Sequence, residues 1–124
     1  MSPEENITLI QRLYEELNRG NLAGVQEFLA PDYVVHDLDN PRFLGDRQSH
    51  KEFLTRFYAT FSGQTTIEDM TAAGDKVVVY KTFHGTSKAE WQGLPPGQQV
   101  TFPVIETYRI ANGKIVEEWH QDRK

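Results

Sequence analysis

The chain has 124 residues, which fits a single domain spanning 1–124 with one hydrophobic core. A net charge of −5 and scattered basic residues argue against nucleic acid or an anionic membrane as a partner, because phosphate binding requires clustered Lys and Arg. The absence of cysteine excludes disulfides and thiolate metal sites. Without a signal peptide or a long apolar run, the sequence predicts a cytoplasmic protein.

The first half predicts helices. Ser2 can cap a helix that begins at Pro3 and ends at Gly20. A second helix is expected at 22–30, a short strand at 33–36 and a loop at 37–47. A third helix is expected at 48–62, closed by Gly63, with one apolar face made by Phe53, Leu54, Phe57, Tyr58 and Phe61.

The second half predicts strands at 65–73, 76–89, 99–110 and 114–122, separated by Gly-containing turns. Helices followed by a strand meander indicate an α+β fold, with helices on one face of a curved sheet and a cavity between them. The strand at 76–89 has large apolar groups on both faces: Val77, Val79 and Phe83 on one, Val78 and Tyr80 on the other. Since helices can cover only one face, we expect a homodimer through the other.

The stretch 91–120 resembles the SnoaL-like polyketide cyclases, a family within the nuclear-transport-factor-2-like superfamily. The resemblance is carried by the loop 93–97 (GLPPG), by 108–110 (YRI) followed by 112–117 (NGKIVE), and by Trp119 before a polar residue. The segments PDYVVHD and HKEFLTRFYATFSG also resemble the family, so the match covers almost the whole chain. The resemblance implies a cone-shaped barrel, with three N-terminal helices packed on a curved, mostly antiparallel sheet that encloses an apolar pocket. It also implies a homodimer and aldol ring closure of a polyketide without metal or cofactor.

The last hairpin has two possible registers. A two-residue loop at Asn112-Gly113 pairs Ala111 with Lys114 and places Ile105 opposite His120. A three-residue loop with a left-handed Gly113 pairs Ile110 with Lys114. It places Val104 opposite His120, with Glu106, Tyr108, Val116 and Glu118 on the same face as His120. We expect the three-residue loop, which the resemblance favours.

The resemblance also implies an acid/base residue after Trp119, where the family has aspartate, and a histidine fourteen residues earlier. Here these positions hold His120 and Glu106, so the two residue types are reversed. We expect His120, as a neutral imidazole suited to proton transfer near pH 7, to move a proton, and Glu106 to orient the ring and raise its pKa. The reversal is equally compatible with loss of the ancestral chemistry.

Five further residues are candidates for contact with the substrate: His36, Phe53, Phe57, Tyr108 and Trp119. Four of them have a structural alternative, namely a hydrogen bond for His36, the core for Phe53 and Phe57, and packing or a dimer interface for Trp119. His84 is another candidate for the cavity wall. No closely spaced ligand pair supports a metal site formed by His36, His84 and His120.

Two functions compete. The first is a cofactor-free enzyme that runs proton-transfer chemistry (aldol cyclisation, isomerisation or dehydration) on a small hydrophobic carbonyl compound. The second is a non-catalytic small-molecule-binding or dimerisation module, in which His120 and Glu106 would be splayed apart or face solvent. An epoxide hydrolase is a weaker third, since Arg109 is expected on the face opposite to Glu106.

Overall fold

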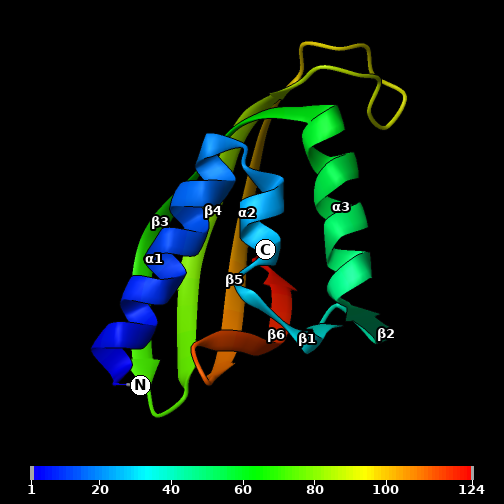
Figure 1. The fold of residues 1–124 in the computed structure, drawn as a ribbon. Helices are drawn as coiled ribbons and strands as arrows, with labels where there is room; N and C mark the ends of the chain where they lie inside the picture. Colours follow the sequence, from blue (N-terminus) through cyan, green and yellow to red (C-terminus); the bar gives the residue numbers. More distant parts are fainter. Residues whose placement is uncertain (1, 124) are drawn as a thin grey trace.

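A computed structural model describes residues 2–123 as helices packed on one curved sheet (Figure 1). The sheet has six strands within these residues, in the order β2-β1-β6-β5-β4-β3, and only the β1–β6 pair is parallel. The elements are α1 (Pro3–Arg19), α2 (Leu22–Gln26), β1 (Leu29–Asp37), β2 (Asn40–Asp46), α3 (Arg47–Thr60), β3 (Phe61–Ala73), β4 (Lys76–Ser87), β5 (Gln99–Ala111) and β6 (Lys114–Asp122).

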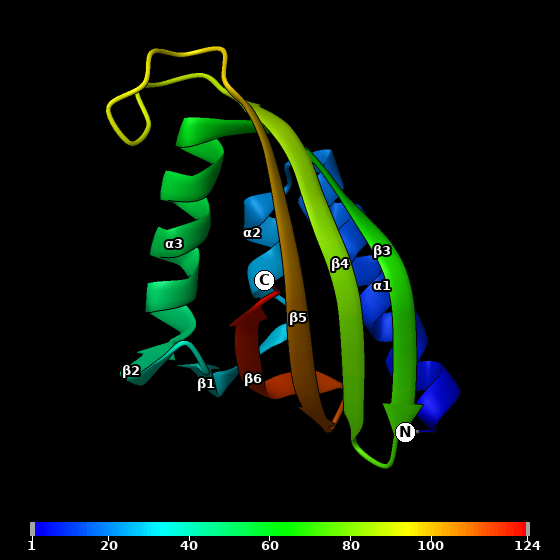
Figure 2. The same ribbon diagram turned by 180° about the vertical axis from the view of Figure 1, so that it is seen from behind.

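The helices cover one face of the sheet and leave the other face bare (Figures 1 and 2). Helix α1 packs on β3 and β4, whereas α3 packs on β1 and β2 at the other end of the sheet. The predicted α+β cone is therefore confirmed, but the sheet does not close into a barrel, and β2 and β3 remain its edges. None of the helices described in residues 2–123 is long and apolar enough to cross a membrane.

The first helix forms as predicted. Ser2 and Glu5 make a capping box, in which each side chain accepts a hydrogen bond from the other residue's backbone N–H. Gly20 ends the helix in the left-handed conformation, at φ 78°. The apolar stripe buries Ile10, Leu13 and Tyr14 against Val77, Val79 and Tyr108 of the sheet.

Three predicted boundaries are wrong. The second helix ends at Gln26, and Pro31 lies inside strand β1, at an irregularity where pairing with β6 is interrupted and no backbone N–H is needed. The expected loop at 37–47 contains strand β2, an exposed edge strand. Helix α3 ends at Thr60, and Gly63 lies in β3 opposite Gly85.

The predicted register of the last hairpin is also wrong. Asn112 and Gly113 form a two-residue loop with φ of 53° and 74°, so that Ala111 pairs with Lys114 as in a type I′ turn. The left-handed Gly113 is confirmed, but Val104 pairs with Asp122 rather than with His120.

A β-bulge nevertheless brings His120 to the expected face. Ile110 pairs with Ile115, whereas the preceding Arg109 pairs with Glu117, which leaves Val116 as an extra residue on β6. Beyond Val116 the pairing is shifted by one residue, so His120 lies directly opposite Glu106. The alternation of side chains then places both on the helix-covered face.

Candidate active site

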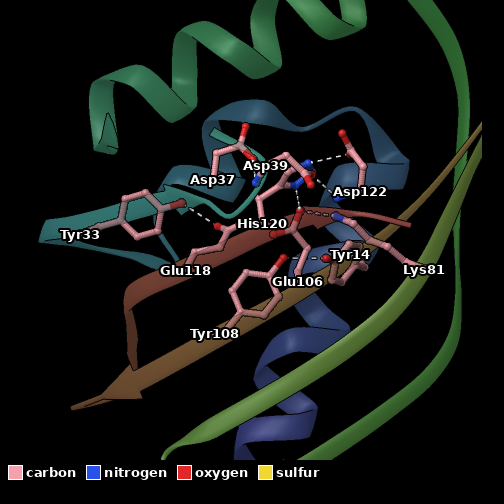
Figure 3. Close-up of polar contacts among 10 residues, drawn as sticks. All are labelled: Tyr14, Tyr33, Asp37, Asp39, Lys81, Glu106, Tyr108, Glu118, His120 and Asp122. Carbon is pink, nitrogen blue, oxygen red and sulfur yellow. Dashed lines mark hydrogen bonds and ion pairs between the residues drawn. The ribbon is translucent and has the colours of Figure 1, made fainter. Parts of the chain in front are cut away.

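His120 and Glu106 form the centre of a polar cluster on the inner face of the sheet (Figure 3). The imidazole Nδ1 of His120, on β6, lies 2.5 Å from Oε1 of Glu106, on β5. The other ring nitrogen, Nε2, lies 2.9 Å from Oδ1 of Asp122, two residues along β6. The two ring nitrogens each face a carboxylate oxygen, and both contacts are hydrogen bonds only when the ring is a doubly protonated imidazolium.

Lys81 supplies a second cation to Glu106. Its Nζ, on β4, lies 3.5 Å from Oε1 of Glu106 and 4.7 Å from the centre of the Tyr14 ring. Glu106 is only 3% exposed. Burial alone would raise the pKa of Glu106, but the charge of Lys81 and the hydrogen bonds from His120 and Glu118 outweigh it and lower the pKa to about 2. Glu106 is therefore a buried carboxylate.

The protonation of His120 differs from the expectation. Burial acts to lower its pKa, but the hydrogen bonds and charges of Glu106 and Asp122 outweigh burial and raise the pKa to about 9. Glu106 raises the pKa of His120 as expected, but the contribution of Asp122 was not predicted, so the ring is protonated at neutral pH where a neutral imidazole was expected. At neutral pH the group is an acid that can donate a proton, not a free base.

Glu118, the neighbour of Glu106 on β6, has the opposite protonation. Its pKa is raised well above the ordinary value, first by burial and then by the charge of Glu106. Its Oε1 accepts a hydrogen bond of 2.6 Å from the Tyr33 hydroxyl. Oε2 of Glu106 is buried and has no other partner among residues 2–123, so a protonated Glu118 is suited to donate to it.

Two cavities meet at His120. One, of about 420 Å³, lies between α3 and strands β1, β2 and β6, and it is lined by Glu118 and His120 among others. The other, of about 550 Å³, lies between α3 and strands β3–β5, and His120, Glu106 and Asp122 line it. Aromatic side chains make up much of this second wall: Phe53, Phe57, Tyr58, Phe61, Phe83, Trp91 and Phe102. His120 therefore lies where a polar group meets space for an apolar molecule.

The structure places the predicted contact residues on both sides of the sheet. Phe53 lines both cavities and Phe57 lines the second one. Tyr108 is buried and lines neither cavity. Its hydroxyl oxygen lies 2.6 Å from the hydroxyl oxygen of Tyr14. His36 reaches the rim of the first cavity.

His36 and Trp119 pair on the outer face. Their rings stack at 5.5 Å, and Nε2 of His36 lies 2.6 Å from Oε2 of Glu117. Trp119 lines neither cavity, so its position fits packing or an interface rather than substrate contact.

The remaining candidates do not converge on His120. His84 is exposed on the outer face, so the structure does not bring His36, His84 and His120 together. No group of three metal-ligating side chains is found in the described residues. Arg109 donates to Oε1 of Glu117 at 3.1 Å on the outer face, as expected, and is remote from Glu106.

Sequence reasoning missed three polar residues near this cluster. Simple strand alternation could have found Lys81, which shares a face of β4 with Val79 and Phe83, and Asp122, which follows His120 by two residues on β6. His50, on the first turns of α3, was read only as part of a helix motif, yet it lines the first cavity. A histidine followed by the apolar positions 53, 54 and 57 on one helical stripe was the signal that it faces inward.

Known proteins share this fold. A family model described as SnoaL-like polyketide cyclase matches residues 8–123. The structure resembles AclR from Streptomyces galilaeus, a proposed hydroxylase, with a TM-score of 0.89 and 26% identity over 98% of this chain and 77% of that one. It also resembles IdmH from Streptomyces antibioticus, a proposed polyketide cyclase, with a TM-score of 0.84 and 28% identity over 94% and 91% of the chains.

A third solved structure shares the fold alone. An epoxide hydrolase from M. tuberculosis has a TM-score of 0.76 and 17% identity over 98% of this chain and 84% of that one. No curated protein matches the sequence.

Proposed function

Because the chain belongs to the SnoaL-like polyketide cyclase family, we propose that it is an enzyme that moves protons on a small hydrophobic carbonyl compound without a cofactor. The reaction class is aldol cyclisation, isomerisation or dehydration. The observation that carries the proposal is the imidazolium of His120, held by a buried carboxylate at the junction of two cavities. A module that only binds a ligand would be expected to hold His120 and Glu106 apart, whereas here the two side chains are in contact.

In this proposal His120 acts as the general acid. Its Nε2–H donates to the carbonyl oxygen of the substrate, which gains negative charge as an enol forms. Glu106 accepts the Nδ1–H throughout, so it fixes the ring and stabilises its charge. Asp122, whose side chain is 59% exposed, gives up its contact with Nε2 when the carbonyl enters. Its carboxylate then lies beside the substrate and accepts the proton from the carbon next to the carbonyl.

The aromatic wall of the second cavity provides the other half of catalysis. Phe57, Phe83 and Phe102 exclude water from the reacting groups, which strengthens the pairing of Glu106 with His120. An apolar substrate body in this space would hold its carbonyl next to His120. The substrate class therefore follows from one polar centre in a largely aromatic cavity.

The test begins with a panel of polyketide-like and steroid-like carbonyl compounds, screened by thermal shift and then for turnover. For a compound that is turned over, His120→Gln should lower kcat by about 10²–10⁴, the usual size of general acid–base catalysis, while ligand binding is retained. His84→Gln on the outer face is the matched control and should leave kcat unchanged. A His120→Gln enzyme as fast as the wild type would refute the assignment and direct attention to Asp37 and Asp39.

A further inference from the structure

His50 is a half-buried histidine that the acid–base chemistry above does not use. It lies in the second turn of α3 and lines the first cavity, which Glu118 and His120 also line from the sheet. The edge of its ring packs against the Tyr33 ring, with centroids 5.6 Å apart. The ring of His50 projects from α3 and is held by contacts with β1 and α2, so it is a fixed part of the cavity wall.

The contacts of His50 determine which ring nitrogen carries the proton. The side-chain amide nitrogen of Gln26, on α2, lies 3.3 Å from Nδ1. An amide nitrogen can only donate, so Nδ1 accepts and the proton of the neutral ring resides on Nε2. Burial lowers the pKa of His50 to about 4, against the opposing charge of Glu106, so the ring is neutral at pH 7.

The Nε2–H group of His50 has no hydrogen-bond partner within the part of the chain that the structure describes. Among residues 2–123 no side chain or backbone group is hydrogen bonded to it. It is also not one of the fully buried unpaired atoms, which are Asn6 Oδ1, Glu106 Oε2 and Arg123 Nε. A donor that is unpaired among these residues, not fully buried and carried by a side chain that lines a cavity is available to a ligand.

We infer that His50 is a second donor of the site, whose Nε2–H binds an oxygen atom of the ligand in the cavity that it shares with His120. The inference rests on the proposed function, which it deepens by adding a ligand-contacting residue. The ligand class is a compound with a carbonyl, enol or phenol oxygen. A neutral imidazole with its other nitrogen occupied donates without giving up its proton, so it stabilises a developing oxyanion and leaves proton delivery to His120.

Other titratable groups surround His50 without a hydrogen bond to Nε2. Tyr33 and Glu118 lie on the sheet side, and both are protonated at neutral pH because burial raises the pKa of each. Glu106 and Lys81 act on the ring through their charges, in opposite directions. Glu52 and Arg56 of α3 line the same cavity. A ligand oxygen is therefore the partner that the Nε2–H lacks.

The experiment uses 2-naphthol, a planar phenol that mimics an enol, as the probe. In nitrogen NMR of the wild-type protein, His50 should be the neutral Nε2–H tautomer at pH 7, and 2-naphthol should move its Nε2 resonance. His50→Leu should raise the dissociation constant of 2-naphthol about tenfold, the size of one lost hydrogen bond. His50→Gln, which keeps a donor near the position of Nε2, should stay within about threefold of the wild type.

A second variant keeps the test decisive if His50→Leu does not fold. Gln26→Leu removes the donor to Nδ1 and should mix the two tautomers, and it should weaken 2-naphthol binding although Gln26 does not line this cavity. A purely structural role would leave the tautomer unmoved. No binding of 2-naphthol to the wild type, or binding that leaves the His50 resonances in place, would overturn the inference.

The two proposals fail differently. If His120→Gln is fully active while 2-naphthol still shifts His50, the proposed function is wrong and the His50 contact stands. If His120→Gln is slow but His50→Leu binds 2-naphthol as the wild type does, the His50 contact is wrong and the proposed function stands.

Discussion

Two consecutive glutamates on β6 illustrate how the face of a strand sets the charge of a residue. Glu117, on the outer face, contacts Arg109 and His36, and its pKa is lowered because these partners outweigh burial. Glu118, on the inner face, is 6% exposed beside Glu106, and its pKa is raised well above the ordinary value. The sequence shows two acids, whereas the fold makes one a carboxylate and the other a carboxylic acid.

Glu118→Gln should stabilise the protein at alkaline pH. The native pKa of Glu118 is raised, so its contribution to stability is full below its ordinary pKa of 4.5 and is lost as pH rises toward the native pKa. Gln keeps the acceptor for Tyr33 and supplies a donor for Glu106 without this loss. We expect this variant to be more stable than the wild type in urea unfolding at pH 8 and to show no such gain at pH 4.

Glu117→Gln is the matched control, because it changes the adjacent residue in the same way. The native pKa of Glu117 is lowered, so its contribution is present above its ordinary pKa and is lost as pH falls through the native value. We expect this variant to be less stable than the wild type at pH 8, with the difference closing toward low pH. Equal effects of the two substitutions at pH 8 would contradict the protonation assigned to Glu118.

Glu106→Gln should lower the pKa of His120 from about 9, because the imidazolium loses the buried charge that stabilises it. We expect a fall of about 1–3 pH units in an NMR titration of His120, the usual effect of an adjacent opposite charge. In a turnover assay, activity that depends on the protonated ring is lost as pH rises through its pKa, so this basic limb should move to lower pH. Asp122→Asn should produce the smaller fall, because Asp122 is the weaker of the two causes. An unchanged His120 titration in Glu106→Gln would disprove the pairing.

At the scale of elements, the last hairpin shows what local sequence reasoning can and cannot determine. Asn112-Gly113 correctly indicated a turn with a left-handed Gly113, because few residues tolerate that conformation. The bulge at Val116 has no comparable signal, since any residue can be the unpaired one. The common face of His120 and Glu106 was thus predicted through a register that is wrong.

Gly113→Ala should destabilise the protein by about 1 kcal/mol, because Ala pays a steric cost at a φ of 74° that Gly does not. Asn112→Gly should be nearly neutral, since Gly also accepts the φ of 53° at that position. Urea denaturation of both variants measures the difference. Equal stability of Gly113→Ala and the wild type would argue against the type I′ turn.

At the scale of the whole molecule, the sequence was sufficient for the fold but not for the cavity. Capping residues, the α1 stripe and the strand meander determined the architecture. The cavity depends on contacts between distant segments, such as Gln26 with His50 or Tyr33 with Glu118, and no local pattern reports them. Strand β2 was missed because an exposed edge strand has few apolar residues.

The bare face of the sheet leads to a prediction about assembly. Val78, Tyr80, Ile105 and Trp119 lie on this face, which no helix covers (Figure 2). We propose that a second copy covers it, so light scattering at micromolar concentration should give the mass of a dimer. Ile105→Glu should give a folded monomer, whereas Thr101→Glu, at an exposed position farther along β5, should remain dimeric. A monomeric wild type would refute the proposal.

The extra residue at Val116 has a consequence for how this gene can change. If Val116 paired with Arg109 and the ladder continued without the bulge, every later position of β6 would be reversed. Trp119 would then lie opposite Glu106 on the inner face, and His120 would lie on the outer face. A one-residue insertion or deletion between the bulge and His120 would likewise replace the imidazole on the inner face with an apolar side chain, whereas loss of Val116 itself would leave His120 opposite Glu106. The number of residues from Glu117 to His120 should therefore be inherited more strictly than the identity of most residues in this hairpin.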